Sequence, residues 1–99
     1  MTTKSAKAKR AVIPANVRSI DTVYDILARD LALPAHFGRN LDALHDALTG
    51  DVEGPFEIVV EDAKAIEATL GGKGRALLKM LRDVGTARSD ATIEVKRPK

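Results

Sequence analysis

The sequence contains no cysteine and no tryptophan, and its only aromatic side chains are Tyr24, Phe37 and Phe56. Without cysteine the chain has no disulfide framework, no thiol nucleophile and no cysteine-based zinc site. No segment approaches the run of about 18 apolar residues that a transmembrane helix needs, and no apolar segment follows the basic start as in a signal peptide. We therefore expect a cytoplasmic protein that packing alone stabilises.

Charge is unevenly distributed along the 99 residues. The whole chain has a net charge of +2, but residues 1–10 carry +4 and residues 96–99 carry +3, which leaves residues 11–95 with −5. We interpret 1–10 as a flexible basic tail, 11–95 as one globular domain and 96–99 as a basic C-terminal end. The acidic body excludes a uniformly basic nucleic-acid-binding domain, while nucleic-acid binding through the tails remains an alternative function.

Hydrophobic periodicity predicts short strands that alternate with pairs of helices. Asp21 is the expected N-cap of the first helix and Asn40 that of the second, which Gly50 closes. Residues 71–74 (Gly-Gly-Lys-Gly) lack the spacing of a phosphate-binding loop and are interpreted as a connection between helices. The predicted elements are a strand at 11–13, helices at 21–31 and 40–49, a strand at 55–60, helices at 62–70 and 74–84, with a stop near Gly85, and a strand at 92–95. This order favours a small α/β domain with a three-stranded parallel sheet flanked by about four helices.

The helix predicted at 40–49 has one apolar and one polar side. Three leucines at i, i+3 and i+7 define the buried side: Leu41, Leu44 and Leu48. The opposite side is a stripe of polar residues: Asp42, His45, Asp46 and Thr49. Like charges four residues apart destabilise a helix by about 0.2–0.5 kcal/mol, and aspartate is a poor mid-helix residue. Solvated helix faces are usually charged, so the spacing alone leaves a structural and a functional interpretation open.

A longer motif surrounds this helix. It consists of Leu33-Pro34, Gly38, the run Asn40 to Leu44, Asp46, and the run Leu48 to Gly50. The motif resembles the barstar family of intracellular ribonuclease inhibitors without a gap from about residue 31 to residue 55, and the general layout follows the family across 11–95. The resemblance implies a three-stranded parallel sheet with flanking helices. It also implies a protein that is no enzyme itself, but plugs a ribonuclease active site with the helix at 40–49 and the preceding loop.

A ribonuclease active site concentrates Arg, Lys and His around a phosphate. Carboxylates on a rigid helix can take the place of that phosphate and accept paired hydrogen bonds from arginine. The resemblance implies that Asp46 is the central phosphate mimic, that Asp42 pairs with a basic residue at the edge of the cleft, and that Asp83 is a further acidic contact. It implies additional contacts at these positions: Phe37, Gly38, Asn40, Leu41, Gly50 and Val52.

Three positions depart from the family pattern. Where other members carry aromatic rings, this chain has His36, His45 and Asp51. Aromatic anchors supply much of the binding energy of protein interfaces, so these replacements bear on affinity and on the identity of the partner. His36 keeps a ring that can stack on the partner, and Asp51 adds negative charge at the rim. Protonation of His45 would dilute the acidic face, so binding is expected to weaken below about pH 6.5.

The expected partner is a secreted or toxin-type ribonuclease bound in a 1:1 complex, with this chain as its immunity protein or antitoxin. No cofactor is expected. Two histidines with Asp42 and no defined third ligand make a weak metal site, and no nucleophile–base pair indicates an enzyme. The alternative, nucleic-acid binding through the basic tails, lacks an aromatic stacking platform.

Overall fold

The computed structural model describes residues 9–34 and 37–97. Its sheet contains three strands: β1 (Lys9–Ile13), β2 (Phe56–Val60) and β3 (Ala91–Val95). Both neighbouring pairs run parallel, and β2 lies in the centre between β1 and β3. The predicted α/β class with a three-stranded parallel sheet is confirmed.

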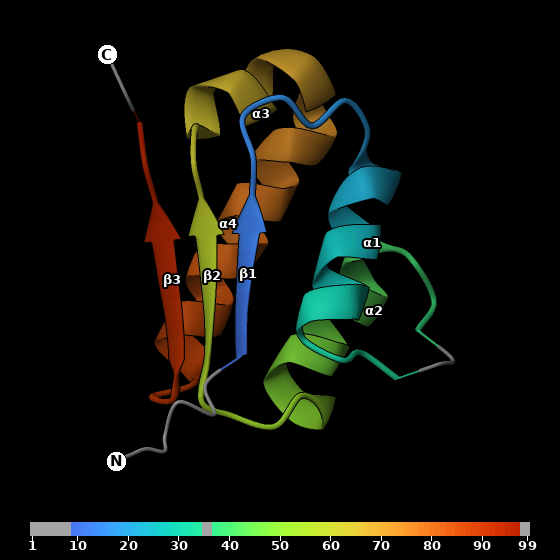
Figure 1. Ribbon diagram of the computed structural model, residues 1–99, viewed down its shortest axis with the longest axis vertical. Helices are drawn as coiled ribbons and strands as arrows, with labels where there is room; N and C mark the ends of the chain where they lie inside the picture. The colour runs from blue at the N-terminus through green and yellow to red at the C-terminus, as the bar shows by residue number, and fades with distance from the viewer. Residues whose placement is uncertain (1–8, 35–36, 98–99) are drawn as a thin grey trace.

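Two helices connect each pair of consecutive strands. They are α1 (Ile20–Asp30) and α2 (Leu41–Asp46) before β2, and α3 (Ala63–Leu70) and α4 (Gly72–Ala87) before β3. Figure 1 shows α4 running behind the sheet, α1 and α2 on the β1 side, and α3 across the end where the strands finish. Among the described residues, no helix is long and apolar enough to cross a membrane.

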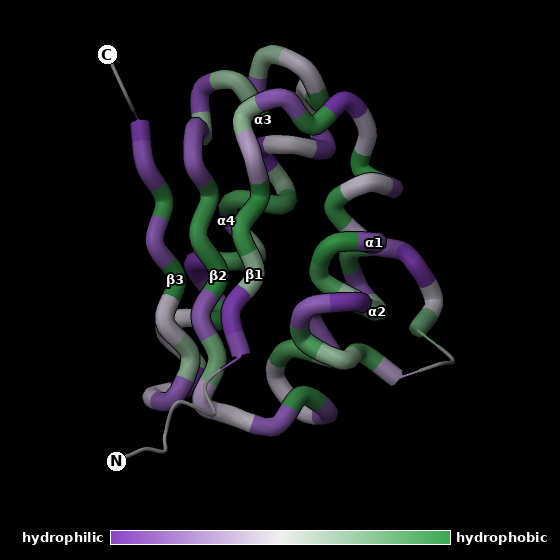
Figure 2. Tube along the Cα trace, in the orientation of Figure 1, coloured by the Kyte–Doolittle hydropathy of each residue, from purple (hydrophilic) through white to green (hydrophobic). Residues whose placement is uncertain are grey.

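The hydrophobic core lies between the sheet and the helices. Every layer supplies fully buried large side chains: Ile13, Leu27, Leu31, Leu44, Leu48, Phe56, Ile58, Ile66, Leu77, Leu78 and Leu81. Figure 2 shows that apolar and polar residues alternate along the helices and strands. Successive strand residues point to opposite faces, and the other face of the sheet carries Arg10, whose Nε lies 3.1 Å from Oε1 of Glu57. The core therefore fixes which side of each helix faces solvent.

Both ends of the domain extend beyond the predicted boundaries. Lys9 and Arg10, which the charge pattern placed in the tail, open β1. After β3, the N–H of Lys96 donates to the carbonyl of Val60 at 2.9 Å, and the Lys96 carbonyl accepts from the N–H of Ala63 at 2.8 Å. Main-chain hydrogen bonds thus order residues that charge alone assigned to the ends.

Two helix boundaries also differ from the predicted ones. Ser19 caps α1, because its hydroxyl accepts from the Thr22 N–H at 3.3 Å, and Asp21 lies inside the first turn. In α4 the helix continues past Gly85, the predicted stop. A Cβ at Gly85 would lie 3.0 Å from Cγ1 of Ile93, so glycine serves the packing of α4 on β3 there.

After α2 the backbone widens into a π-helical turn, Ala47–Asp51, where the sequence predicted a continuous α-helix closed by Gly50. The N–H of Val52 donates to the carbonyl of Ala47 at 2.9 Å, five residues back. The Thr49 hydroxyl donates at 2.7 Å to the carbonyl of His45, the acceptor that the Thr49 amide would use in an α-helix. Gly50 therefore lies inside the turn and ends no α-helix.

Arg88, just after α4, holds this turn against the sheet. Its Nη1 donates to the carbonyls of Leu48 at 3.0 Å and Val52 at 2.7 Å, while Nε and Nη2 donate to the two Asp90 carboxylate oxygens at 2.9 and 2.8 Å. The guanidinium lies 5.1 Å from the ring centroid of Phe56. The hydrogen bond from Arg88 lowers the pKa of the Asp90 carboxyl. Because the Arg88 side chain is only 17% exposed, its contacts are largely shielded from solvent.

We expect Arg88→Ala to lower the free energy of unfolding by about 1–3 kcal/mol, because the Leu48 and Val52 carbonyls lose their donor. Urea unfolding at pH 7 measures this loss. As a matched control, Arg29→Ala removes a paired contact to Asp30 from an arginine that is 72% exposed, and should cost less than about 1 kcal/mol. The Arg88 effect should shrink as the pH falls from about 4 through the lowered pKa of the Asp90 carboxyl. Equal losses in both variants would contradict the role given to Arg88.

The connection between α3 and α4 lies within residues 71–74, as predicted, and α3 ends at Gly71, whose φ is 61°. Gly74 lets the two helices approach closely. A Cβ at Gly74 would lie 2.7 Å from the carbonyl oxygen of Ile66, whereas a Cβ at Gly72 would meet nothing nearer than 3.8 Å.

We expect Gly74→Ala to destabilise the fold by about 1–3 kcal/mol despite the higher helix propensity of alanine. Gly72→Ala should be neutral or slightly stabilising. Matching urea midpoints for the two variants would refute this account of the helix contact.

Candidate functional site

The start of α2 is fixed by Asn40, as predicted. Its Oδ1 accepts from the Ala43 N–H at 2.8 Å, and its Nδ2 donates to the Gly38 carbonyl at 3.2 Å. The cap satisfies a free N–H of the first turn and ties the helix to the preceding loop. Leu44 and Leu48 are completely buried. With its apolar side fixed in the core, the helix turns its other side to solvent.

The exposed side of α2 carries two of the predicted carboxylates and an imidazole. Asp42 is exposed, and the Asp46 side chain is 86% exposed. His45 lies between them in sequence, and its Nδ1 is 4.0 Å from Oδ1 of Asp46. Thr49 is half-buried and turns its hydroxyl to the backbone. The face therefore consists of Asp42, His45 and Asp46, without a contribution from the Thr49 hydroxyl.

Of the clefts that border this face, two contain more than one of the predicted carboxylates. The first, about 230 Å³, lies between α2 and the loop before it and is lined by Pro34, Phe37, Gly38, Ala43, Asp46, Ala47 and Asp51. The second, about 410 Å³, lies between α2 and α4 and is lined by Leu41, Asp42, His45, Ala76, Lys79, Met80 and Asp83. Each cleft thus brings together two predicted carboxylates, one of which comes from α2.

Asp83 reaches the second cleft from α4. Its Oδ2 lies 3.8 Å from Nζ of Lys79, one helical turn earlier. The two side chains are 59% and 81% exposed, so the pair contributes little to stability. Asp83 can therefore exchange Lys79 for a cation of a partner at small cost.

The remaining predicted residues have other surroundings. Gly50 is exposed in the π-helical turn. Val52 is 3% exposed and belongs to the core, so only its backbone is near the surface, and its carbonyl already accepts from Arg88. The side chain of Asn40 is occupied by the helix cap. His36 lies outside the described residues.

Negative charge accumulates around α2 without local compensation. In the described part of the chain, seven of the 14 acidic side chains form an ion pair with Lys or Arg: Asp21, Asp25, Asp30, Glu57, Glu67, Asp83 and Asp90. Four without such a pair follow one another in and after α2: Asp42, Asp46, Asp51 and Glu53. No Lys or Arg occurs between residues 40 and 53. Such a surface attracts a cationic cleft.

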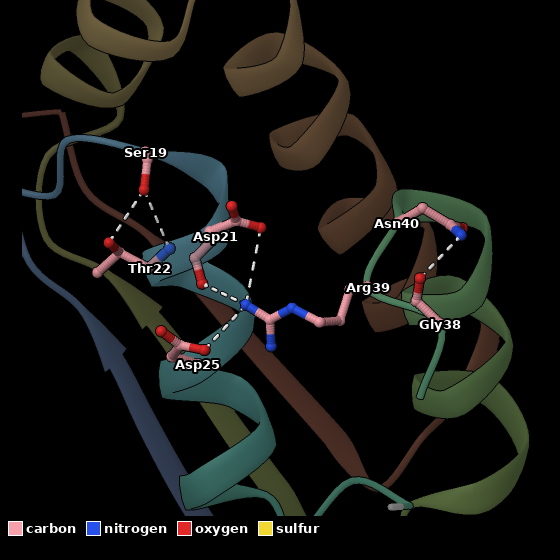
Figure 3. A network of polar contacts seen from close by, with 7 residues as sticks. All are labelled: Ser19, Asp21, Thr22, Asp25, Gly38, Arg39 and Asn40. Atoms are coloured by element: carbon pink, nitrogen blue, oxygen red, sulfur yellow. Dashed lines mark hydrogen bonds and ion pairs between the residues drawn. The ribbon is translucent and has the colours of Figure 1, made fainter. Parts of the chain in front are cut away.

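Arg39, to which the sequence pattern assigned no role, lies at the edge of the site. From the loop before α2, its Nη2 donates to Oδ1 of Asp25 at 2.9 Å and to the Asp21 carbonyl at 3.2 Å, both on α1 (Figure 3). Its guanidinium carbon lies 5.7 Å from the ring centroid of Tyr24. The sequence held one indication of a role for Arg39, because it is the single Lys or Arg between residues 30 and 63. Its partners on α1 are not readable from a single sequence.

Within residues 9–34 and 37–97, no three His, Asp or Glu side chains gather in a way that would hold a metal ion. The described residues of the basic ends do not converge either. Arg10 pairs with Glu57, and Nη2 of Arg97 lies 3.0 Å from Oε2 of Glu67. Because the strands are parallel, the start of β1 and the end of β3 lie at opposite ends of the sheet. These positions do not favour one basic surface for nucleic acid.

Known proteins share this sequence pattern. The family model described as Barstar (barnase inhibitor) matches residues 9–96, a range that begins with the first residue of β1 and spans all three strands. A protein of Bacillus subtilis (strain 168) named "Putative ribonuclease inhibitor YrdF" is 34% identical over 65 residues, which make up 66% of this chain and 71% of that protein. The chain therefore belongs to the barstar family.

Proposed function

We propose that this chain inhibits a ribonuclease by inserting the acidic face of α2 into its active site. The observation that carries the proposal is the pair Asp42 and Asp46, exposed on a helix whose opposite side is fixed in the core, in a stretch without Lys or Arg. Membership of the barstar family supports a ribonuclease-inhibitor role. So does the name of the Bacillus subtilis relative.

In the proposed complex Asp46 occupies the position of an RNA phosphate. A carboxylate accepts two parallel hydrogen bonds from a guanidinium, which is also how arginine holds phosphate. Asp42 and Asp83 line the neighbouring cleft and contact basic residues at the edge of the nuclease site. Because the cap and the buried leucines already hold α2 in place, little conformational entropy is lost on binding.

The partner in this proposal is a secreted or toxin-type ribonuclease, bound 1:1, and the chain acts in the cytoplasm as its immunity protein or antitoxin. The opposite charges of the two surfaces accelerate their encounter, and salt screens this attraction. His45 and Asp51 give the rim a polar and acidic character, which favours a partner with a basic rim.

The chain itself, immobilised and exposed to the secreted proteins of its source organism, should capture a ribonuclease whose RNA hydrolysis it then abolishes at one equivalent. Asp46→Ala should raise the Kd about 100-fold, because it leaves an active-site cation buried without its partner, a loss of about 3 kcal/mol. Asp42→Ala should have a smaller effect in the same direction. Inhibition titrations with the captured enzyme measure both.

Glu94→Ala is the matched control, because Glu94 is an exposed carboxylate on β3 that forms no ion pair in the described part of the chain. It removes the same charge and should change the Kd less than about threefold. If Asp46→Ala and Asp42→Ala inhibited as well as Glu94→Ala, the acidic face would not be the inhibitory surface.

A further inference from the structure

Arg39 links the loop before α2 to α1 through a single nitrogen. Nη2 lies 2.9 Å from Oδ1 of Asp25 and 3.7 Å from Oδ1 of Asp21, and it also donates to the Asp21 carbonyl at 3.2 Å (Figure 3). The Arg39 backbone adopts the left-handed conformation, with φ at 54°. A residue with a Cβ rarely holds this conformation unless its surroundings fix it. The ion-paired side chain is one contact that holds this segment in place.

Tyr24 of α1 is the platform for the same loop. Tyr24 is 4% exposed, and two loop residues contact its ring. Phe37 packs edge-on against it, with the ring centroids 5.6 Å apart and the planes at 79°, and Arg39 lies 5.7 Å from its centroid. Together these contacts attach both described loop residues that flank Gly38 to α1.

The attached loop determines how the acidic face is presented. Arg39 directly precedes Asn40, the cap of α2, and α2 has only six residues. The loop residues Phe37 and Gly38 also form one wall of the cleft that contains Asp46. A shift of the loop would therefore move the first turn of α2, with Asp42, and change the shape of that cleft.

We propose that Arg39 is a positioning residue of the inhibitory site, and that Asp25 and Asp21 support the site from α1; this inference rests on the proposed function. Charge alone predicts the opposite effect. Removing a cation beside an acidic face should speed association with a basic nuclease and tighten the complex. Loss of positioning should instead speed dissociation, because a loosened loop must be ordered again in every complex.

The rate constants for the captured ribonuclease separate these two effects. Arg39→Ala should raise the dissociation rate constant roughly three- to tenfold, with an association rate constant that is unchanged or faster. Lys73→Ala is the matched control, because Lys73 lines the same 560 Å³ cleft as Arg39 and forms no ion pair in the described residues. It should leave dissociation unchanged. Arg39→Lys should restore most of the slow dissociation, since one nitrogen makes every polar contact that the Arg39 side chain forms with the described residues.

A double-mutant cycle tests the pathway through α1. Asp25→Asn should also speed dissociation, but it should have no further effect in the Arg39→Ala background. Urea unfolding of each variant sets a temperature at which all are folded, so that a general loss of stability does not enter the rates. Additive effects of the two substitutions, or equal dissociation rates for Arg39→Ala and Lys73→Ala, would overturn the proposal.

Hydrogen exchange measured on the chain alone tests the positioning role of Arg39 independently of any ribonuclease. The N–H groups of Phe37 and Leu44 donate to the carbonyls of Pro34 and Asn40 at 3.0 and 2.9 Å. Arg39→Ala should accelerate their exchange at least threefold and leave the amides of β2 unchanged. If exchange responds but the wild-type chain inhibits no ribonuclease, the proposed function fails and the positioning contact stands. If exchange does not respond, the positioning role fails whatever the chain inhibits.

Discussion

Burial of the leucine side of α2 is the constraint on which the functional face depends. Leu44 of α2 and Leu48 of the π-helical turn that continues it are completely excluded from solvent, so the helix has one possible orientation about its axis. That orientation turns Asp42 and Asp46 outward, although two like charges on one short helix disfavour it locally. Packing in the core outweighs this small repulsion, because burying a leucine contributes about 1.5–3 kcal/mol. The fold thus sustains an arrangement of carboxylates that the isolated helix would not favour.

Two arginines outside α2 complete this arrangement. Arg88 binds the carbonyls of the π-helical turn from the end of α4, and Arg39 binds the carboxylate of Asp25 from the loop before α2. Both arginines therefore donate hydrogen bonds to acceptors within the chain. The segment between them, residues 40–53, contains no cation of its own. Positive charge holds the two ends of the site in place, while the surface between them stays acidic and open to a cationic partner.

The sequence predicted the order of the elements, the parallel sheet and the polar side of α2, because these features depend on local periodicity and on caps such as Asn40. It did not predict the π-helical turn, since a threonine hydroxyl that takes a carbonyl from the helix ladder leaves no periodic signal. The roles of Arg39 and Arg88 depend on contacts between residues 14 to 40 positions apart, which a single sequence does not encode. The family resemblance implies a contact at Val52, but packing places its side chain in the core. The contacts proposed with a nuclease remain predictions.

The central claim is that the acidic face of α2 occupies the phosphate site of a ribonuclease. Competition between the chain and a nucleoside monophosphate for the captured ribonuclease tests it most directly. If carboxylate and phosphate use the same cations, the apparent Kd of the chain should rise in proportion to the nucleotide concentration once the nucleotide saturates the enzyme. An apparent Kd that stayed constant at saturating nucleotide, at fixed ionic strength, would show that the chain binds elsewhere and would contradict the account.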